Sequence, residues 1–287
     1  MTLDTDGSIF QFLKHFHARF DGSFPDCATT IGASSYELLA QVAATASVGD
    51  GHSPLRILEV GCGDGRLLQI LDDAVTPRPE LTGVDLVPEQ IERAISRLAG
   101  RPVRLLCEAS QNMSPDTASF DCVLIHMALA FMQPVGETLA EIDRVLGRGG
   151  ILAIVAERPA EIDSIDNQCS QIMRRVALAE QPDLLKLIQS DQRVASSPDL
   201  TKLIEQTTNL SQHLPPQPFD AQLEVTAETY IEFAEGDYLW PYLTKAGKAL
   251  TRQKIRVVFD QQTEEHVIVP LAMNLLVFQK ARCISLL

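Results

Sequence analysis

The stretch ILEVGCGDGRLLQIL, from Ile57 to Leu71, decides the fold of this chain. Apolar Ile57, Leu58 and Val60 predict a buried strand, and the glycines that follow permit a tight turn and the close approach of a ligand. Leucines then return at helical spacing, which predicts a helix after the turn. Because the first N–H groups of a helix have no partner within it, the pattern predicts a ligand bound at the turn.

Two carboxylates accompany this turn. Glu59 lies two residues before the first of Gly61, Gly63 and Gly65, and Asp64 lies among them. Dinucleotide-binding proteins use the different spacing G-x-G-x-x-G to hold a pyrophosphate, which these two carboxylates would repel. The turn therefore favours a ligand that carries an ammonium group and hydroxyls.

The turn resembles the first motif of the class I S-adenosylmethionine-dependent methyltransferases, whose cofactor is a sulfonium with an amino acid tail. The resemblance implies that Glu59 helps to hold the amino end of the cofactor. It also implies that the turn residues pack against the cofactor, namely Gly61, Cys62, Gly63 and Gly65. An ordinary strand-to-helix turn without a ligand is the alternative interpretation.

The next strand ends in a further acid. In the segment from Glu80 to Leu98, a short apolar strand ends at Asp85 and a helix begins with Pro88 in its first turn. Asp85 lies about 20 residues beyond the glycine turn, a separation at which an acid reaches ribose hydroxyls. The resemblance places this role on Asp85, with Leu86 in the same site. A helix N-cap is the alternative for Asp85.

The third and fourth strands add further candidates at their carboxyl ends. The third, within Arg101–Ala109, ends in Glu108 and Ala109, where the resemblance implies contact with the adenine amino group. The family usually has an aspartate there, so the longer glutamate puts this contact in doubt, and a solvated strand end is the alternative. The fourth strand, Asp121–Ile125, is followed by His126, which the resemblance places beside the methionine part of the cofactor.

The segment from Glu137 to Val155 predicts an amphipathic helix, a glycine stop at Gly149 and Gly150, and a fifth strand. Strands and helices thus alternate over about 100 residues, which is typical of α/β proteins. We expect a Rossmann-like, doubly wound, seven-stranded and mostly parallel sheet, with ligands at the carboxyl ends of its strands.

The flanking regions divide the chain into four expected segments. Residues 1–54 form an N-terminal helical lid, in which Ser8–Phe20 has one apolar face, and residues 55–156 form the cofactor-binding core. Residues 157–218 form a helical cap inserted after the fifth strand and closed by the proline cluster Leu214–Phe219. Residues 219–287 complete the sheet. A lid packed permanently on the core, and a cap that forms a dimer contact, are the alternatives.

Composition limits the classes of partner. The 287 residues are 45% hydrophobic and carry a net charge of −14, which disfavours nucleic acid and anionic membranes. A small-molecule substrate, free or bound to a carrier protein, is favoured. We find no apolar run of membrane-spanning length and no export signal, so a cytoplasmic protein is expected. The six cysteines lack the close pairing of a zinc site or a disulfide framework, so no metal is expected.

Two residues are candidates for catalysis. His126 could accept a proton from an oxygen or nitrogen nucleophile, because an imidazole titrates near working pH. A wall of the methionine pocket is the alternative role for this residue. Tyr36 could reach the sulfonium through the face of its ring, although structural packing is the simpler interpretation.

The expected function is methyl transfer from S-adenosylmethionine to a small metabolite, by a monomer or a homodimer. One alternative is a cyclase that forms azetidine-2-carboxylate and methylthioadenosine from the same cofactor. Another is a noncatalytic protein that binds the cofactor or acts as a scaffold. The sequence leaves the acceptor and the attacked carbon atom undetermined.

Overall fold

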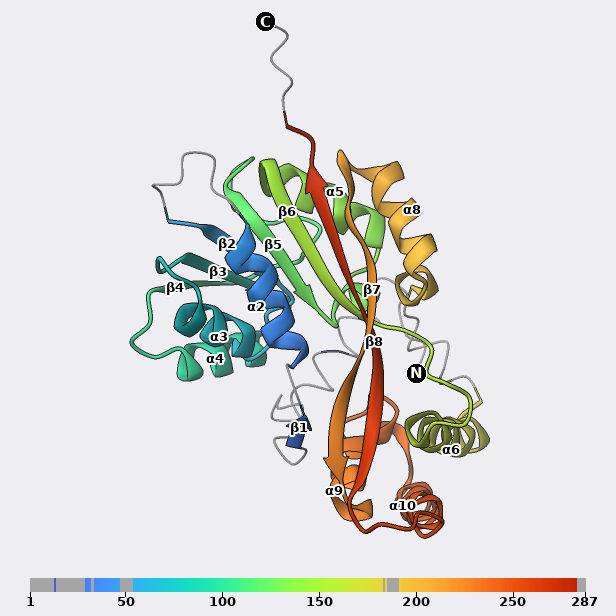
Figure 1. The fold of residues 1–287 in the computed structure, drawn as a ribbon. Helices are drawn as coiled ribbons and strands as arrows, with labels where there is room; N and C mark the ends of the chain where they lie inside the picture. Colours follow the sequence, from blue (N-terminus) through green and yellow to red (C-terminus); the bar gives the residue numbers. More distant parts are fainter. Residues whose placement is uncertain are drawn as a thin grey trace, which may run out of the picture. The chain divides into compact units, whose positions relative to one another are not determined.

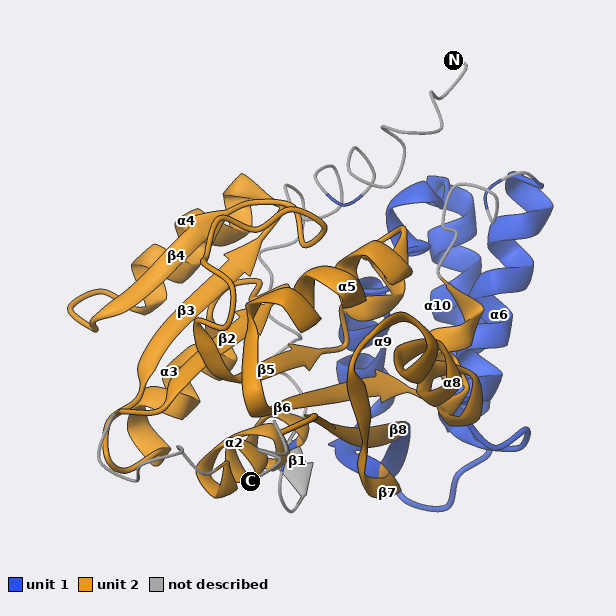
Figure 2. Ribbon diagram, turned by 90° about the horizontal axis from the view of Figure 1, so that it is seen from above, with its two compact units in different colours: residues 1–34, 159–189, 220–272 blue, residues 35–158, 190–219, 273–287 orange. Residues whose placement is uncertain are grey.

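The computed structural model describes residues 13, 29–31, 34–46, 54–182, 184 and 191–282. The expected helix over Ser8–Phe20 lies outside this part of the chain, apart from Leu13. The chain divides into two compact units (Figure 2), and each is described by itself. The first, orange and labelled unit 2 in Figure 2, comprises residues 35–158, 190–219 and 273–287, and the second, blue and labelled unit 1, comprises residues 1–34, 159–189 and 220–272.

The expected seven-stranded, mostly parallel sheet is confirmed. Its strands stand in the order β7-β8-β6-β5-β2-β3-β4, and the short β1 (Thr29–Ile31) pairs with β7. The five adjacent strands from β6 to β4 are parallel, whereas β8 runs antiparallel to β6. The strands other than β1 are β2 (Arg56–Val60), β3 (Glu80–Asp85), β4 (Val103–Cys107), β5 (Phe120–His126), β6 (Leu146–Glu157), β7 (Leu210–Val225) and β8 (Val267–Lys280).

Helices cover the parallel strands (Figure 1), and every residue from Gly150 to Ala156 in β6 is buried. On one side, α2 packs on α3, and α3 packs on α4; on the other, α5 packs on α8. The core includes Leu139 of α5 and Ile204 of α8 together with Ile125 of β5. The helices are α2 (Ser35–Thr45), α3 (Arg66–Ala74), α4 (Pro88–Arg97), α5 (Val135–Val145) and α8 (Ser197–Thr207), with 3-10 turns η1 (Leu129–Phe131) and η2 (Gln192–Ala195).

The described residues of the second unit include three helices and one 3-10 turn, together with β1 and the ends of β7 and β8. The long α10 packs on both α6 and α9, and the buried Tyr230 of α9 donates a hydrogen bond of 2.8 Å to Asp166 of α6. The helical elements of this unit are α6 (Ile165–Glu180), α9 (Ala227–Glu235), η3 (Trp240–Tyr242) and α10 (Lys245–Phe259). The segment 157–218, expected to form one cap, is therefore shared between the two units, with α6 in one and α8 in the other.

The predicted glycine stop is wrong. Helix α5 ends at Val145, and β6 begins at the next residue, so Gly149 and Gly150 lie within β6. The pairing of β5 with β6 shifts its register here, and this irregularity accommodates Gly149 and Gly150. Gly149 has a φ of 76°. The ammonium of Lys280 donates to the carbonyl oxygens of Asp143 and Leu146, so the helix end needs no glycine cap.

The proline cluster also lies in a different element from the one predicted. Leu214–Phe219 does not end a helical region but lies inside the strand β7. In the described part of the chain, β1 pairs only with Gln222–Glu224, so no strand flanks the cluster on that side. Proline is tolerated where its missing N–H is not needed by a neighbouring strand.

No helix within the described ranges is long and apolar enough to cross a membrane.

We predict that Leu139→Ala lowers the free energy of unfolding by about 2–5 kcal/mol, because it leaves a cavity in a closely packed core. Leu139 is fully buried between α5 and the sheet. Urea denaturation measures the change. Ile95→Ala is the matched control, since Ile95 is 57% exposed and should change stability by less than about 0.5 kcal/mol. Equal losses in the two variants would contradict this description of the core.

Candidate functional site

The glycine turn joins β2 to α3 and has a left-handed backbone at Gly61, Gly63 and Gly65, with φ of 74°, 52° and 81°. Gly61 N–H and Cys62 N–H both donate to the carbonyl of Val84 in β3, at 2.8 and 3.0 Å. A Cβ on Gly61 would approach Ala128 and Met132 to 2.7 Å, so a side chain is excluded there. At Gly63, in contrast, no atom of the described residues other than its chain neighbours lies within 4 Å of a Cβ position. The turn is therefore tightly packed at Gly61 and open at Gly63.

The carboxylate of Glu59 is buried beside this turn. Only 2% of the residue is exposed, and its Oε2 has no hydrogen-bond partner among the described residues. Burial raises the pKa of Glu59 well above its usual value, and the negative charges of Asp64 and Asp85 raise it further. A hydrogen bond from the backbone of Leu68 acts in the opposite direction. Glu59 is thus a buried acid with one unsatisfied oxygen atom.

Asp85, the last residue of β3, connects the turn to the start of α4. Its Oδ2 accepts from Gly63 N–H and its Oδ1 from Val87 N–H, both at 2.9 Å. Burial raises the pKa of Asp85 in spite of these hydrogen bonds. Each carboxylate oxygen can accept a second hydrogen bond, so the side chain retains capacity for a ligand. The N-cap residue of α4 is Val87, so Asp85 is not itself the helix N-cap.

Glu108 follows β4 and lies next to Asp85 across the sheet. Its N–H donates to the carbonyl of Asp85 at 3.0 Å, and its carboxylate accepts from Ser114 N–H at 2.8 Å. Leu86 and Ala109, the other predicted neighbours, are half-buried. The acid of the turn, Asp64, forms an ion pair with Arg97 of α4.

His126, at the end of β5, contacts the start of α2. Its Nε2 is hydrogen-bonded to Ser35 Oγ at 2.8 Å, and its ring stacks on Tyr36 with centroids 3.8 Å apart. Burial and, to a smaller extent, the guanidinium of Arg66 together lower the pKa of His126 to about 3. Burial likewise raises the pKa of Tyr36, so both side chains are neutral near neutral pH. Arg66 lies over the Tyr36 ring, 5.1 Å from its centroid.

Adjacent parallel strands bring four predicted residues to one edge of the sheet. Glu59, Asp85, Glu108 and His126 lie at or next to the carboxyl ends of β2, β3, β4 and β5. The hydroxyl of Ser35 was not predicted from the sequence. Its position before an apolar helical pattern indicates a helix start, but nothing in the sequence links it to His126, 91 residues away.

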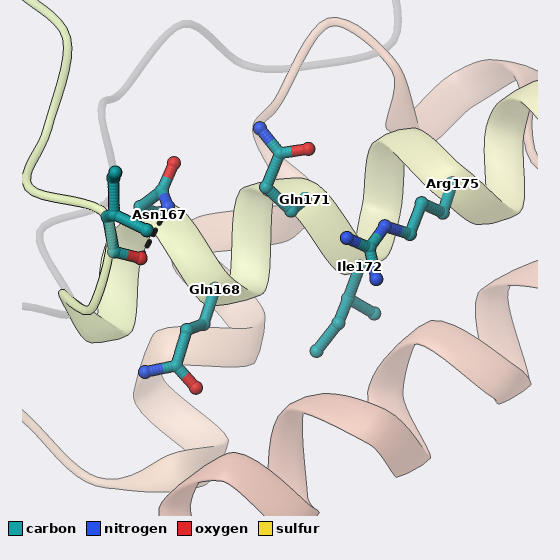
Figure 3. Close-up of a pocket in the computed structure, with 6 residues that line it drawn as sticks. Asn167, Gln168, Gln171, Ile172 and Arg175 are labelled. Atoms are coloured by element: carbon teal, nitrogen blue, oxygen red, sulfur yellow. Dashed lines mark hydrogen bonds between the residues drawn. The ribbon is translucent and has the colours of Figure 1, made fainter.

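A separate open pocket lies on α6 in the second unit (Figure 3). None of the residues predicted for the ligand site lines it. Its lining consists of amide, guanidinium and aliphatic side chains from Ile162, Asn167, Gln168, Gln171, Ile172 and Arg175. Asn167 donates from its amide to the carbonyl of Ile162 at 2.7 Å, which ties the helix to the preceding loop.

Comparison with known proteins connects this site to one domain family. Residues 58–154 match the model of the methyltransferase domain. Malonyl-(acyl-carrier protein) O-methyltransferase of Anoxybacillus flavithermus is 34% identical over 101 residues, covering 35% of this chain and 38% of the relative. Trans-aconitate 2-methyltransferase of Methylobacterium nodulans is 29% identical over 125 residues, covering 44% of this chain and 45% of the relative. The chain thus spans less than half of the length of these curated relatives.

A likeness to a solved structure covers more of the chain. The YcgJ protein of Bacillus subtilis aligns with a TM-score of 0.57 over 87% of this chain and 99% of its own. The two sequences are 16% identical, so this likeness shows a shared fold.

We predict that Glu59→Gln stabilises the free protein increasingly as pH rises above the usual glutamate value. A raised pKa means that the folded state holds its proton when the unfolded chain has lost it, so the free energy of unfolding falls with rising pH. Glutamine removes this dependence. Denaturation at about pH 5 and about pH 8 should therefore show a larger gain for the variant at the higher pH.

The exposed Glu92→Gln is the matched control and should show no such gain. A Glu59→Gln variant whose advantage does not grow with pH would show that Glu59 is ionised without cost in the free protein.

Proposed function

Because residues 58–154 belong to the class I S-adenosylmethionine-dependent methyltransferase domains, we propose that this chain is an enzyme that methylates a small-molecule acceptor. S-adenosylmethionine is the cofactor of this domain family. The relatives that carry an activity in their names are matched over less than half of their length, so the activity is proposed from the site itself.

The observation that carries the proposal is the unsatisfied carboxylate oxygen of Glu59 beside an open glycine turn. Buried polar atoms in proteins almost always have partners, so an orphan at the end of a strand indicates that a ligand supplies one. An ammonium group is the complementary partner, because it donates hydrogen bonds and offsets a buried negative charge. Such a ligand can lie close to the backbone of Gly63, because the described residues leave the space at its Cβ position open. These features fit the amino acid end of S-adenosylmethionine.

The other polar residues of this edge fit the nucleoside end. Asp85 retains lone pairs for the two ribose hydroxyls, and the turn amide at Gly63 holds its carboxylate in position. We assign the adenine amino group to Glu108, whose carboxylate is fixed by Ser114. The remaining predicted residues would border the cofactor through their backbone or side chains, namely Gly61, Cys62, Gly65, Leu86, Ala109 and His126.

When bound, the cofactor supplies an electrophilic methyl group, and the protein must place the acceptor in line with it and exclude water. A histidine with a pKa of about 3 is a weak base, so His126 is better suited to orient and shield than to remove a proton. Its hydrogen bond to Ser35 and its stacking on Tyr36 hold the ring in place. Because the Tyr36 ring already stacks on His126 and lies under the guanidinium of Arg66, we assign it a packing role rather than contact with the sulfonium.

His126 is a weak base, so the described residues of the site favour an acceptor that is already ionised. A carboxylate attacks through oxygen without losing a proton, so we propose a carboxylic acid as the acceptor class. The names of two relatives, which act on a malonyl carrier protein and on trans-aconitate, support this proposal. The acid would be presented either free or as an acyl chain on a carrier protein.

Calorimetric titration with S-adenosylmethionine tests the cofactor site. We expect Glu59→Gln and Asp85→Ala each to weaken binding about 10- to 100-fold, since a hydrogen bond to a charged group contributes about 1.5–3 kcal/mol. Asp85→Asn, which keeps one acceptor oxygen, should lose less. The exposed Glu92→Gln is the control and should bind as the wild type does. Wild-type protein that binds no cofactor would refute the proposal and favour a scaffold role.

Product analysis separates methyl transfer from cyclisation. With cofactor and a panel of carboxylic acids, we expect S-adenosylhomocysteine to form only when an acceptor is present. The acceptor requirement follows because methyl transfer needs a second substrate, whereas intramolecular attack needs none. Methylthioadenosine released from the cofactor alone would overturn the proposal and establish the cyclase.

A further inference from the structure

Helix α10 differs in charge from the chain that contains it. Over Lys245–Phe259 it has no carboxylate, although the protein has a net charge of −14. Its five cationic side chains are Lys245, Lys248, Arg252, Lys254 and Arg256. A positively charged helix attracts an acidic partner locally, although the rest of this acidic protein repels such a partner.

One face of α10 is fixed against its neighbours within the second unit. Ile255, Val258 and Phe259 are buried, and the helix packs on α6 and α9 (Figure 2). Its first turn is tied to α6, because the carboxylate of Glu180 accepts from Thr244 N–H at 2.8 Å. The opposite face is therefore presented on a rigid element.

The exposed face combines apolar and cationic side chains. Ala246, Leu250, Lys254 and Val257 follow each other at intervals of four, four and three residues, which aligns them in one row. Leu250 is 42% exposed and Val257 is 51% exposed. Lys245 lies beside this row. Exposed aliphatic side chains interspersed with lysines are suited to an acidic surface that also has apolar residues.

The lysines of this face are available for a partner. Arg252 is paired with Glu235 and Arg256 with Glu228, both on α9. Within the described part of the chain, by contrast, no carboxylate lies within ion-pair distance of Lys245 or Lys254. As far as the chain is described, this helix face thus has two positive charges without a carboxylate partner, beside the exposed aliphatic side chains of Leu250 and Val257.

We infer that this face of α10, formed by Lys245, Ala246, Leu250, Lys254 and Val257, docks an acidic helical carrier protein that bears the acceptor as an acyl chain. Charge complementarity supports an acidic protein, and the exposed row of aliphatic side chains supports a helical surface with apolar residues. Nucleic acid offers phosphates but no apolar complement to Leu250 and Val257. A membrane would require a larger apolar face than two aliphatic side chains.

The inference rests on the proposed function, because a carrier is required only if the acceptor is an acyl chain. It concerns α10 alone, however, whereas the cofactor site concerns the ends of β2 to β5. The two can therefore be tested separately.

The test measures binding of a holo acyl carrier protein, labelled with a fluorophore on its phosphopantetheine thiol, to the full chain by fluorescence anisotropy. We expect saturable binding that weakens as salt is raised, since screening reduces attraction between exposed charges. The double variant Lys245→Glu/Lys254→Glu should weaken binding at least tenfold. Leu250→Ser/Val257→Ser, which leaves all charges in place, should also weaken it.

The control variant is Lys202→Glu, an exposed lysine on α8 in the other unit, which should bind the carrier as the wild type does. Calorimetry with S-adenosylmethionine on the same samples should give unchanged affinity, which shows that the variants are folded. Cofactor binding without carrier binding, or equal carrier affinity in the wild type and the double charge variant, would overturn the inference and leave the proposed function standing. Preferential binding of anionic phospholipid vesicles through the same lysines would also overturn it.

Discussion

This site depends on the carboxylate of Glu59. It is buried away from water, and one of its oxygen atoms has no hydrogen-bond partner among the described residues. Isolating a negative charge from water costs several kcal/mol unless a cation or hydrogen-bond donors offset it. In the free protein the raised pKa of Glu59 expresses this cost. A ligand with an ammonium group removes it, so the unfavourable arrangement of the free protein becomes a source of affinity and of selectivity for a cation.

The parallel sheet explains why the complementary groups are in reach. Hydrogen bonding of β2 to both β3 and β5, and of β3 to β4, aligns the ends of four strands that lie far apart in the sequence. The glycines then remove side chains where the backbone of the turn must come close, at Gly61 to the η1 region and, in the complex we propose, at Gly63 to the ligand. Acidic groups at both ends of the site, with neutral His126 and Tyr36 beside it, match a molecule that is cationic at its centre and polar at its extremities.

Sequence reasoning works best where local pattern and function coincide. The strand ending at Asp85 and the turn at Gly61–Gly65 were predictable, because a buried strand, glycines and an acid must occur in that order for this site. The end of α5 was not, because the capping group is Lys280, far along the chain. The strand character of Leu214–Phe219 escaped prediction because prolines indicate a break unless the strand is known to be at an edge. The contact of Ser35 with His126 depends on how α2 packs on β5, which no local pattern encodes.

The protonation of Glu59 gives the most direct test. If the free protein holds a proton on this carboxyl group, binding the cationic cofactor must release it. Calorimetric titration of S-adenosylmethionine at mildly acidic pH, in buffers of different ionisation enthalpy, counts the released protons. The account predicts net proton release by the wild type and its absence in Glu59→Gln. Equal proton counts in the two proteins would contradict it.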